Sequence, residues 1–319
     1  MLKQVIKPAL IAHGGAGGRA PASERLERQR ALVAAVERGA GILREGGSAI
    51  DAVTSTVAAL EDHGLFNAGF GSVLTREGRV EMDAAIMVAE RQADQAHSNA
   101  KARKKAGTNV RAGGVVLVSR LPNPILLARF VMERTPHVLI GGAAAERLAR
   151  EAGIRRCRPE QLITERARNR WLASLQTPNK ASGHDGTVGA AALDRAGNLA
   201  AATSTGGVSG KMPGRIGDSA IIGAGLYAAA TGAASATGTG EAIMRACLCR
   251  EGVRLLSAGV QRAAVSAIDH FYAETGGEAG LVLVDSRGRC GYAHNAQAME
   301  IALFEPPRDI RHLVLNPIG

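Results

Sequence analysis

The amino-acid sequence predicts an α+β fold in which two stacked, mainly antiparallel sheets are flanked by helices. Hairpins of strands and pairs of helices come in runs, instead of alternating one by one as they would in a doubly wound parallel sheet. Of the 319 residues, 46% are hydrophobic and only 3% are aromatic. We therefore expect one structural domain with a sizeable core, packed mostly from Ala, Val, Leu and Ile.

The first 90 residues are expected to form a buried strand, two helices and a hairpin. Apolar residues recur at helical spacing after the cluster His13-Gly-Gly-Ala-Gly-Gly18, and Gly46 ends that helix. Ser48 and Asp51 resemble a capping box that opens the second helix. The expected bounds are a strand at 8–13, helices at 23–45 and 48–63, a compact loop at 65–71, and paired strands at 73–75 and 80–88 around a turn at 76–79.

Residues 89–111 lose all periodicity and are rich in Lys and Arg, so they are expected to form an exposed, mobile insertion. Regular structure then returns. The expected elements are a strand at 114–119 and helices at 124–134, 143–152 and 161–175. A polar linker of turn-forming residues, 176–186, closes this first part of the chain.

The part of the chain after the linker has a different character. Two short apolar runs around a polar turn predict a hairpin, and a long glycine-rich loop follows it. The expected elements are strands at 187–193 and 199–204, a loop at 206–225, helices at 240–257 and 260–272, and a last hairpin of strands at 280–285 and 291–294.

The formal net charge of +10 is compatible with an acidic substrate, a nucleic acid or a solvated surface. No aromatic RNA-binding motif or array of basic helices supports a nucleic-acid partner. The cysteines have no zinc-finger spacing and are expected to be reduced thiols: Cys157, Cys247, Cys249 and Cys290. The apolar run at 9–12 is too short for a signal-peptide core, and no stretch is long enough to span a bilayer, so a cytoplasmic protein is expected.

The segment with the clearest chemical signal is Gly186-Thr187-Val188, where the polar linker meets a buried strand. A threonine that opens a strand is ordinary when taken alone. After Thr187, however, hydroxyls, an Arg/Asp pair and glycine turns recur within a short stretch. They lie in the segments Thr203-Ser-Thr-Gly-Gly207, Pro213-Gly-Arg-Ile-Gly-Asp-Ser219, Gly223-Ala-Gly225 and Thr237-Gly-Thr-Gly-Glu241.

These segments resemble those of the plant-type asparaginase and isoaspartyl peptidase family, whose relatives include glycosylasparaginase and the taspase proteases. Further motifs in the same order extend the resemblance over nearly the whole chain. They are His13-Gly-Gly-Ala-Gly17, Leu65-Phe-Asn-Ala-Gly69, Glu81-Met-Asp-Ala84, and the string from Asn123-Pro124 to Pro136-His-Val138. The resemblance implies the four-layer αββα sandwich of the N-terminal nucleophile hydrolases.

The resemblance implies that the chain cuts itself between Gly186 and Thr187. The Thr187 hydroxyl would attack the Gly186 carbonyl, and water would resolve the resulting ester into an α subunit, 1–186, and a β subunit, 187–319. The freed amine of Thr187, with an unperturbed pKa of ~7.7–8.0, could then act as the base for its own hydroxyl. The mature enzyme would hydrolyse the β-amide of L-asparagine, β-aspartyl dipeptides, or both, through an acyl-enzyme on Thr187.

The remaining site residues are implied in the same way. Thr205 would hydrogen-bond the nucleophile, and Asn67 would support it. Two segments would bind the substrate, namely Arg215, Ile216, Gly217 and Asp218, and Thr237, Gly238, Thr239 and Gly240. Within them, Arg215 would hold the α-carboxylate and Asp218 the α-ammonium. The Thr237 hydroxyl and the Gly238 amide would form the oxyanion hole.

No catalytic cofactor is expected. A structural sodium ion is implied at backbone carbonyls of the loop from 60 to 70, at Leu60, Glu61, His63, Phe66, Ala68 and Phe70. The expected partner is a small-molecule substrate, without nucleic acid or membrane. The expected assembly is a dimer of αβ heterodimers.

Three alternatives stay open from the sequence. A glycosylasparaginase-like amidase would use the same nucleophile on a glycosylated asparagine. A dinucleotide-binding protein is suggested by Gly15-x-Gly17-x-x-Ala20, which follows a strand and precedes a helix. A nucleic-acid-binding protein is suggested by the net charge, and its binding would weaken steeply with salt.

Overall fold

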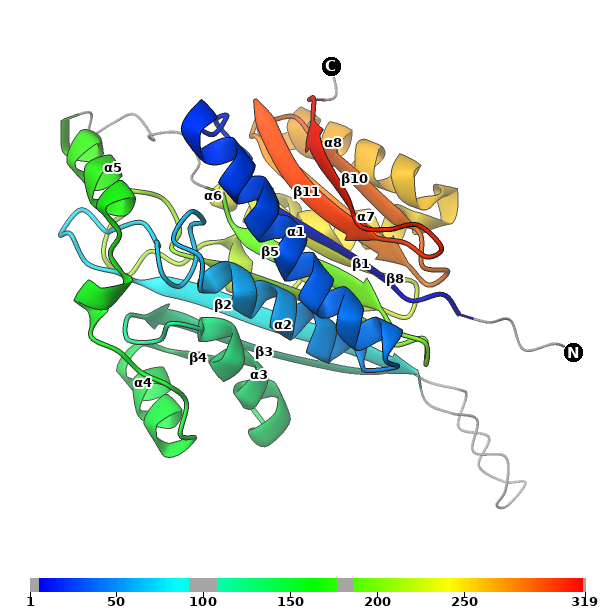
Figure 1. Ribbon diagram of the computed structural model, residues 1–319, viewed down its shortest axis with the longest axis horizontal. Coiled ribbons are helices and arrows are strands. Elements are labelled where there is room, and N and C mark those ends of the chain that lie inside the picture. The colour runs from blue at the N-terminus through cyan, green and yellow to red at the C-terminus, as the bar shows by residue number, and fades with distance from the viewer. Residues whose placement is uncertain (1–5, 92–107, 177–185, 318–319) are drawn as a thin grey trace, which may run out of the picture.

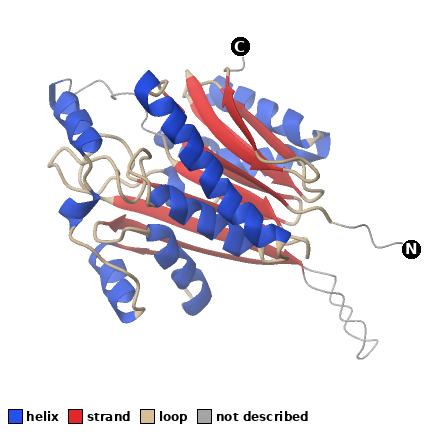
Figure 2. Cartoon of the chain, in the orientation of Figure 1, coloured by secondary structure: helices blue, strands red, loops and turns tan. Residues whose placement is uncertain are grey.

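The computed structural model describes residues 6–91, 108–176 and 186–317. Two stacked sheets form its centre, and helices cover the outer face of each sheet (Figures 1 and 2). The predicted αββα sandwich is therefore confirmed.

The larger sheet has eight strands in the order β12-β11-β1-β5-β6-β2-β3-β4. Its pairs are antiparallel except for β3 and β4, which run parallel. The strands are β1 (Ala9–Gly17), β2 (Met82–Arg91), β3 (Thr108–Val118), β4 (Leu139–Gly141), β5 (Val188–Leu193), β6 (Leu199–Thr205), β11 (Ala298–Phe304) and β12 (Arg311–Leu315). Strand β5, which follows Thr187 directly, lies near the middle of this sheet.

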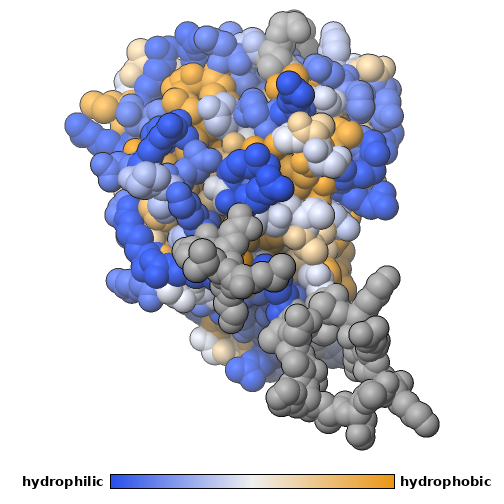
Figure 3. Space-filling view, turned by 90° about the vertical axis from the view of Figure 1, so that its right-hand side faces the viewer, coloured by the Kyte–Doolittle hydropathy of each residue, from blue (hydrophilic) through white to orange (hydrophobic). Residues whose placement is uncertain are grey.

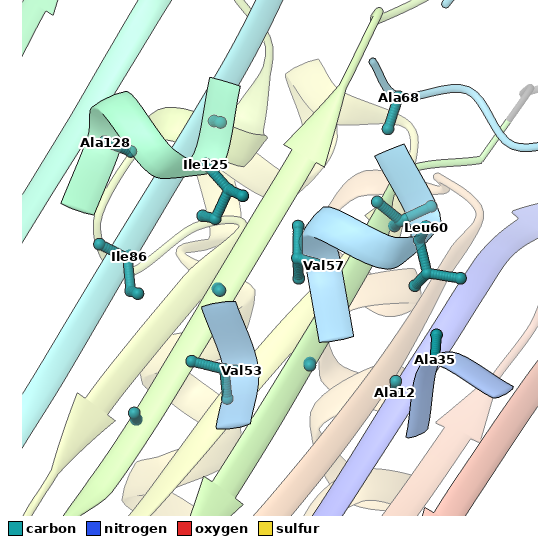
Figure 4. Close-up of a cluster of buried hydrophobic side chains, with 14 of the residues drawn as sticks. Ala12, Ala35, Val53, Val57, Leu60, Ala68, Ile86, Ile125 and Ala128 are labelled. Carbon is teal, nitrogen blue, oxygen red and sulfur yellow. The ribbon is translucent and has the colours of Figure 1, made fainter. Parts of the chain in front are cut away.

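One helical layer packs on the outer face of the larger sheet. It consists of α1 (Ala22–Arg44), α2 (Ala49–Glu61), α3 (Pro124–Arg134) and α4 (Gly142–Glu151). Figure 4 shows how Val53, Val57 and Leu60 of α2 meet Ile86 of β2 and Ile125 of α3 in this core. As predicted, the Ser48 side chain caps α2 by accepting a hydrogen bond from the amide of Asp51. A short 3-10 turn, η1 (Pro159–Leu162), and α5 (Glu165–Gln176) lead toward residue 186.

The smaller sheet and the second helical layer come from the last third of the chain. The strands are β7 (Leu226–Ala229), β8 (Gly232–Gly238), β9 (Ala279–Asp285) and β10 (Cys290–His294), in the order β10-β9-β8-β7. The outer helices are α6 (Gly240–Ala246), α7 (Leu248–Arg254) and α8 (Val260–Thr275). Two short 3-10 turns, η2 (Asp218–Ala220) and η3 (Leu255–Ala258), complete the elements.

Alanine dominates the layer between the two sheets. Every residue of β5 and β6 is buried, because a helix covers one face of these strands and the smaller sheet covers the other. Small side chains such as Ala191 and Ala201 let the sheets approach closely. A strand buried on both faces therefore appears in the sequence as a continuous apolar run instead of an alternating one.

Several expected boundaries are wrong. Strand β1 continues through the glycine cluster to Gly17, with an irregularity between His13 and Ala16. The expected 73–75/80–88 hairpin is reduced to a single bridge between Leu74 and Val80, because β2 pairs with β3 and β6 instead. The ends of the 89–111 insertion belong to the β2–β3 ladder, and residues 92–107 lie outside the described part of the chain.

Other differences lie in the second half of the chain. The expected helix at 240–257 breaks at Cys247, which takes a left-handed backbone conformation with φ of 48°. Five strands were not expected at all: β4, β7, β8, β11 and β12. Strands β4 and β12 are short, and β7 and β8 are rich in Ala and Gly, so these four sequences carry little strand signal before neighbours pair with them.

The topology and surface bear on the alternative functions. Strand β1, which carries the Gly15-x-Gly17 pattern, is antiparallel to both of its neighbours, whereas the dinucleotide-binding fold requires parallel strands there. Among the described residues, no helix is long and apolar enough to cross a membrane. On the face in Figure 3, hydrophobic residues form small groups among polar ones.

Candidate active site

Thr187 lies at the start of β5, near the centre of the larger sheet, with 6% of its surface exposed. It borders a small hollow lined by Gly186, Thr187, Thr205, Gly207, Val208, Arg215, Asp218 and Gly238. The hollow has a volume of about 10 Å³, which holds about one water molecule. The continuous chain therefore leaves no room for an amino-acid substrate beside Thr187.

The backbone of Thr187 is held at both ends by side chains from other strands. Its amide donates to Oγ1 of Thr237 at 3.0 Å, and the same oxygen accepts from the amide of Ala16 at 3.2 Å. Its carbonyl oxygen lies 2.9 Å from Nδ1 of His13. These contacts tie the start of β5 to β1 and to β8 of the smaller sheet.

His13 is fully buried, and burial lowers the pKa of its imidazole to about 4. The ring is therefore neutral near pH 7, with one donor and one acceptor nitrogen. Since a carbonyl can only accept, Nδ1 carries the proton toward Thr187, and Nε2 accepts from the Ser235 hydroxyl at 2.7 Å. His13 thus orients the Thr187 backbone, a role that the sequence did not suggest.

The hydroxyl of Thr187 lies 3.3 Å from Oγ of Ser219, which is fully buried. Thr205 lines the same hollow, but its Oγ1 accepts from the amide of Gly207 at 2.9 Å. Sequence reasoning named Thr205 and missed Ser219, although Ser219 follows Asp218 directly in the quoted motif.

Gly186 approaches the backbone of β1 at Gly15. A methyl group added to Gly15 would lie 2.6 Å from the Cα of Gly186, which is too close for any side chain. Both residues have positive φ, 113° for Gly15 and 69° for Gly186. Two glycines are required here because side chains would clash and would strain both backbones.

The side chains of Arg215 and Asp218, which both line the hollow, meet next to Gly240. A Cβ added to Gly240 would lie 2.7 Å from Nη2 of Arg215 and 2.8 Å from Oδ1 of Asp218. Nε and Nη2 of Arg215 each donate to Glu241 at 2.9 Å. Glu241 therefore fixes the guanidinium plane, in addition to its expected place in the first turn of α6.

Asp218 is buried, and its Oδ2 accepts no hydrogen bond from the described residues. Burial raises the pKa of this carboxyl to about 7, although the positive charge of Arg215 opposes the shift. A buried carboxylate oxygen that accepts no hydrogen bond favours binding of a cation such as an ammonium group.

Lys211 and Asp83 are both buried, and the charge of each acts on the other, but sequence reasoning gave neither a role. Nζ of Lys211 donates to the Glu81 carbonyl at 2.7 Å. Asp83 accepts from the amides of Gly217 and Leu117, at 3.2 Å and 3.0 Å, and burial raises its pKa. Asp83 therefore holds the loop that carries Arg215 and Asp218. Asp83 could have been identified from the sequence, because it is a charged residue inside an apolar strand.

The other expected substrate-binding residues are spread around the hollow. Gly238 lines it, and Oγ1 of Thr239 accepts from the Glu278 amide at 3.3 Å. Ile216 packs toward the layer between the sheets. Gly217 and Gly240 both lie against the Arg215 side chain.

Asn67 supports the loop after β6. Its Nδ2 donates to the Gly207 carbonyl at 2.7 Å, and its Oδ1 accepts from the Val73 amide at 2.9 Å. Within the described part of the chain, no hydrogen bond joins Asn67 to Thr187, so Asn67 acts on the hollow through Gly207.

The loop after α2 folds back on itself through Glu61, whose carbonyl accepts from the amide of Phe70 at 2.8 Å. Carbonyls of Glu61 and Phe66 lie where side chains would project from Gly69 and Gly71. These oxygens make a cradle that suits a hard cation better than a side chain. Among the described residues, no cluster of His, Cys, Asp and Glu side chains could hold a metal.

Comparison with known proteins gives one consistent result. A family model described as asparaginase matches residues 6–309. An isoaspartyl peptidase/L-asparaginase of Homo sapiens is 40% identical over 291 residues, covering 89% of this chain and 88% of the relative. That of Xenopus laevis is 39% identical, covering 89% and 87%. An isoaspartyl peptidase of Escherichia coli (strain K12) is 38% identical over 311 residues, covering 92% and 91%.

Proposed function

Because this chain belongs to the asparaginase family, we propose that it is a self-cleaving amidohydrolase that acts on L-asparagine and on β-aspartyl dipeptides. The names of the relatives favour this activity over a glycosylasparaginase-like amidase and over dinucleotide or nucleic-acid binding. The observation that carries the proposal is the hollow beside Thr187, which brings a hydroxyl nucleophile together with Arg215 and Asp218.

Cleavage precedes hydrolysis in this proposal. The Thr187 hydroxyl attacks the Gly186 carbonyl, the C–N bond breaks, and the amide nitrogen takes a proton to become the free amine of Thr187. Water then hydrolyses the ester and leaves Gly186 as a carboxylate. The left-handed conformation of Gly186 and its close approach to Gly15 support this step, because only glycine allows the chain to lie against β1 in this conformation.

In the mature enzyme, the amine of Thr187 accepts the proton of its own hydroxyl as that hydroxyl attacks the β-carbonyl of the substrate. Arg215 binds the α-carboxylate, and Asp218 binds the α-ammonium. Thr237 and Gly238 border the place where negative charge develops on the carbonyl oxygen. Ammonia or an amino acid leaves with the proton, and water releases aspartate from Thr187.

The direct test is hydrolysis of two substrates by the purified protein, L-asparagine and β-aspartyl-leucine, with aspartate release as the measurement. We expect both to be hydrolysed after the chain is cut into fragments 1–186 and 187–319. Cut protein that releases no aspartate from either substrate would contradict the proposed activity.

The affinity for the product L-aspartate should depend on the ionisation of Asp218. Its pKa of about 7 means that the carboxyl is charged above pH 7 and neutral below it. The inhibition constant should therefore rise by about tenfold per pH unit below pH 7, because a neutral carboxyl does not hold the ammonium group. A constant that stays flat from pH 5.5 to 8.5 would rule this role out, and Asp218→Asn should remove the dependence.

A structural sodium ion at the 60–70 loop is also part of this proposal. The cradle of Glu61 and Phe66 carbonyls supports it, and the remaining oxygens would come from Leu60, His63, Ala68 and Phe70. Replacing sodium by choline at constant ionic strength should lower the thermal midpoint of unfolding. An unchanged midpoint would count against the ion.

The assembly and location complete the proposal. We infer a dimer of αβ heterodimers in the cytoplasm, with a small-molecule substrate as the partner. Light scattering on the cut protein should give twice the mass of one chain, and a mass of one chain would contradict the dimer.

A further inference from the structure

We propose that Ser219 is a positioning residue for self-cleavage, whose hydroxyl holds the hydroxyl of Thr187 in place while the chain is still uncut. The inference rests on the proposed function and deepens it, because it assigns a residue to the first of the two reactions. It also separates that reaction from the hydrolysis of substrate, in which Ser219 should matter less.

The hydroxyls of Ser219 and Thr187 meet inside the protein. Their oxygens lie 3.3 Å apart, Ser219 is fully buried, and Thr187 is 6% exposed. Among the described residues, Ser219 is the one whose side chain forms a hydrogen bond with Oγ1 of Thr187. The contact that Thr205 makes is with the amide of Gly207 instead. Ser219 therefore fixes the rotation of the Thr187 side chain about its Cα–Cβ bond.

Ser219 reaches Thr187 from the side away from the hollow. Thr187 and Asp218 both border the hollow, whereas Ser219 does not. A substrate in the opened hollow would therefore meet Thr187 and Asp218 without touching Ser219. Any effect of Ser219 on either reaction has to pass through Thr187.

The turn that carries Ser219, η2, is held from several sides. The Thr203 hydroxyl donates to the Ser219 carbonyl at 2.5 Å. The amides of Ile221 and Gly225 donate to the Asp218 carbonyl at 2.8 Å and 3.1 Å. A Cβ added to Gly225 would lie 2.7 Å from the Cα of Ser219, so the next loop packs directly on the turn. The Ser219 hydroxyl is therefore presented to Thr187 from a preorganised support.

The uncut chain lacks the base that the mature enzyme is proposed to use. The nitrogen of Thr187 is a peptide amide that donates to Oγ1 of Thr237 at 3.0 Å, and its lone pair is delocalised into the peptide bond. It cannot act as a base on the hydroxyl before the attack, so the attack depends more on a hydroxyl that is already in the right rotamer. After the cut, the free amine contacts the hydroxyl itself. Loss of Ser219 should therefore slow cleavage more than hydrolysis.

The first experiment follows newly synthesised chain in a cell-free system, with intact mass at timed intervals. Ser219→Ala should slow the formation of fragments 1–186 and 187–319 about tenfold, since one hydrogen bond to the reacting group is lost. Ser209→Ala is the matched control, because Ser209 is also buried on the glycine-rich loop, and its hydroxyl has no hydrogen-bond partner among the described residues. It should cut at the unsubstituted rate.

Equal cleavage rates for Ser219→Ala and Ser209→Ala would overturn the inference and leave the proposed function intact. Unsubstituted chain that stays whole would overturn the proposed function and this inference with it.

The second experiment measures hydrolysis of L-asparagine by the fully cut variants. Ser219→Ala should lower kcat by threefold or less and leave KM unchanged, because Ser219 does not border the space for substrate. A tenfold rise in KM would overturn the inference, since it would make Ser219 a substrate-binding residue.

The third experiment separates positioning from a general structural effect. Threonine is branched at Cβ and restricts its own rotation, whereas serine does not. Ser219→Ala should therefore slow cleavage by a larger factor in a Thr187→Ser chain, about thirtyfold, than in a chain that keeps Thr187. The same factor in both chains would overturn the inference, because a structural loss would be independent of how freely the nucleophile rotates.

Discussion

Thr187→Ala is expected to leave the chain uncut at its full length of 319 residues and without hydrolytic activity. The substitution removes the hydroxyl that is proposed to attack the Gly186 carbonyl, and without the cut the hollow of about 10 Å³ does not open. Loss of a covalent nucleophile lowers kcat by about 10⁴–10⁶. Intact mass and aspartate release are the two measurements.

Thr187→Ser is the matched control, since it keeps the hydroxyl and loses only a methyl group. It should still cut itself, more slowly, because the hydroxyl is less restricted in rotation. A Thr187→Ala protein that yields fragments 1–186 and 187–319, or that hydrolyses asparagine, would show that another residue is the nucleophile.

Arg215→Ala is expected to lower kcat/KM for asparagine and for β-aspartyl-leucine by about 10²–10³, with cleavage of the chain intact. The guanidinium plane is held ready by two hydrogen bonds of 2.9 Å to Glu241, so the substrate carboxylate meets a preorganised partner. Losing one member of a buried ion pair with substrate accounts for a loss of this size. The measurement is steady-state kinetics on the cut protein.

Arg254→Ala is the matched control, because Arg254 also forms two hydrogen bonds with a glutamate, Glu251, but on the outer helical layer. It should leave kcat/KM unchanged. Arg215→Lys should restore only part of the loss, since an ammonium group cannot make the planar bidentate contact. An Arg215→Ala enzyme with unchanged kcat/KM would remove Arg215 from the substrate site.

The layered fold could be predicted because the apolar periodicity of a long helix is visible in its own sequence. The helices over 23–45 and 124–134 were expected almost to the residue, since apolar periodicity, Gly46 and Pro124 are local features. Strands β7 and β8 were missed because they are rich in alanine and glycine, which have low strand propensity. Only burial between neighbouring layers makes those segments strands.

In the candidate site too, some residues were predicted from the sequence and others were found only in the structure. Thr187, Arg215, Asp218 and Gly238 were named from the order of motifs, and they line one hollow. Ser219 and His13 were missed, although both contact Thr187 directly. A serine or a histidine does not indicate from its sequence neighbours alone that it will contact a distant threonine.

The sequence by itself determined the layered fold class and which threonine to examine, because helix periodicity and ordered motifs are properties of adjacent residues. Only the tertiary structure decided what surrounds that threonine. It brought His13 of β1, Ser219 of the glycine-rich loop and Thr237 of β8 onto Thr187. These contacts join residues far apart in the chain, and only packing of the layers brings such residues together.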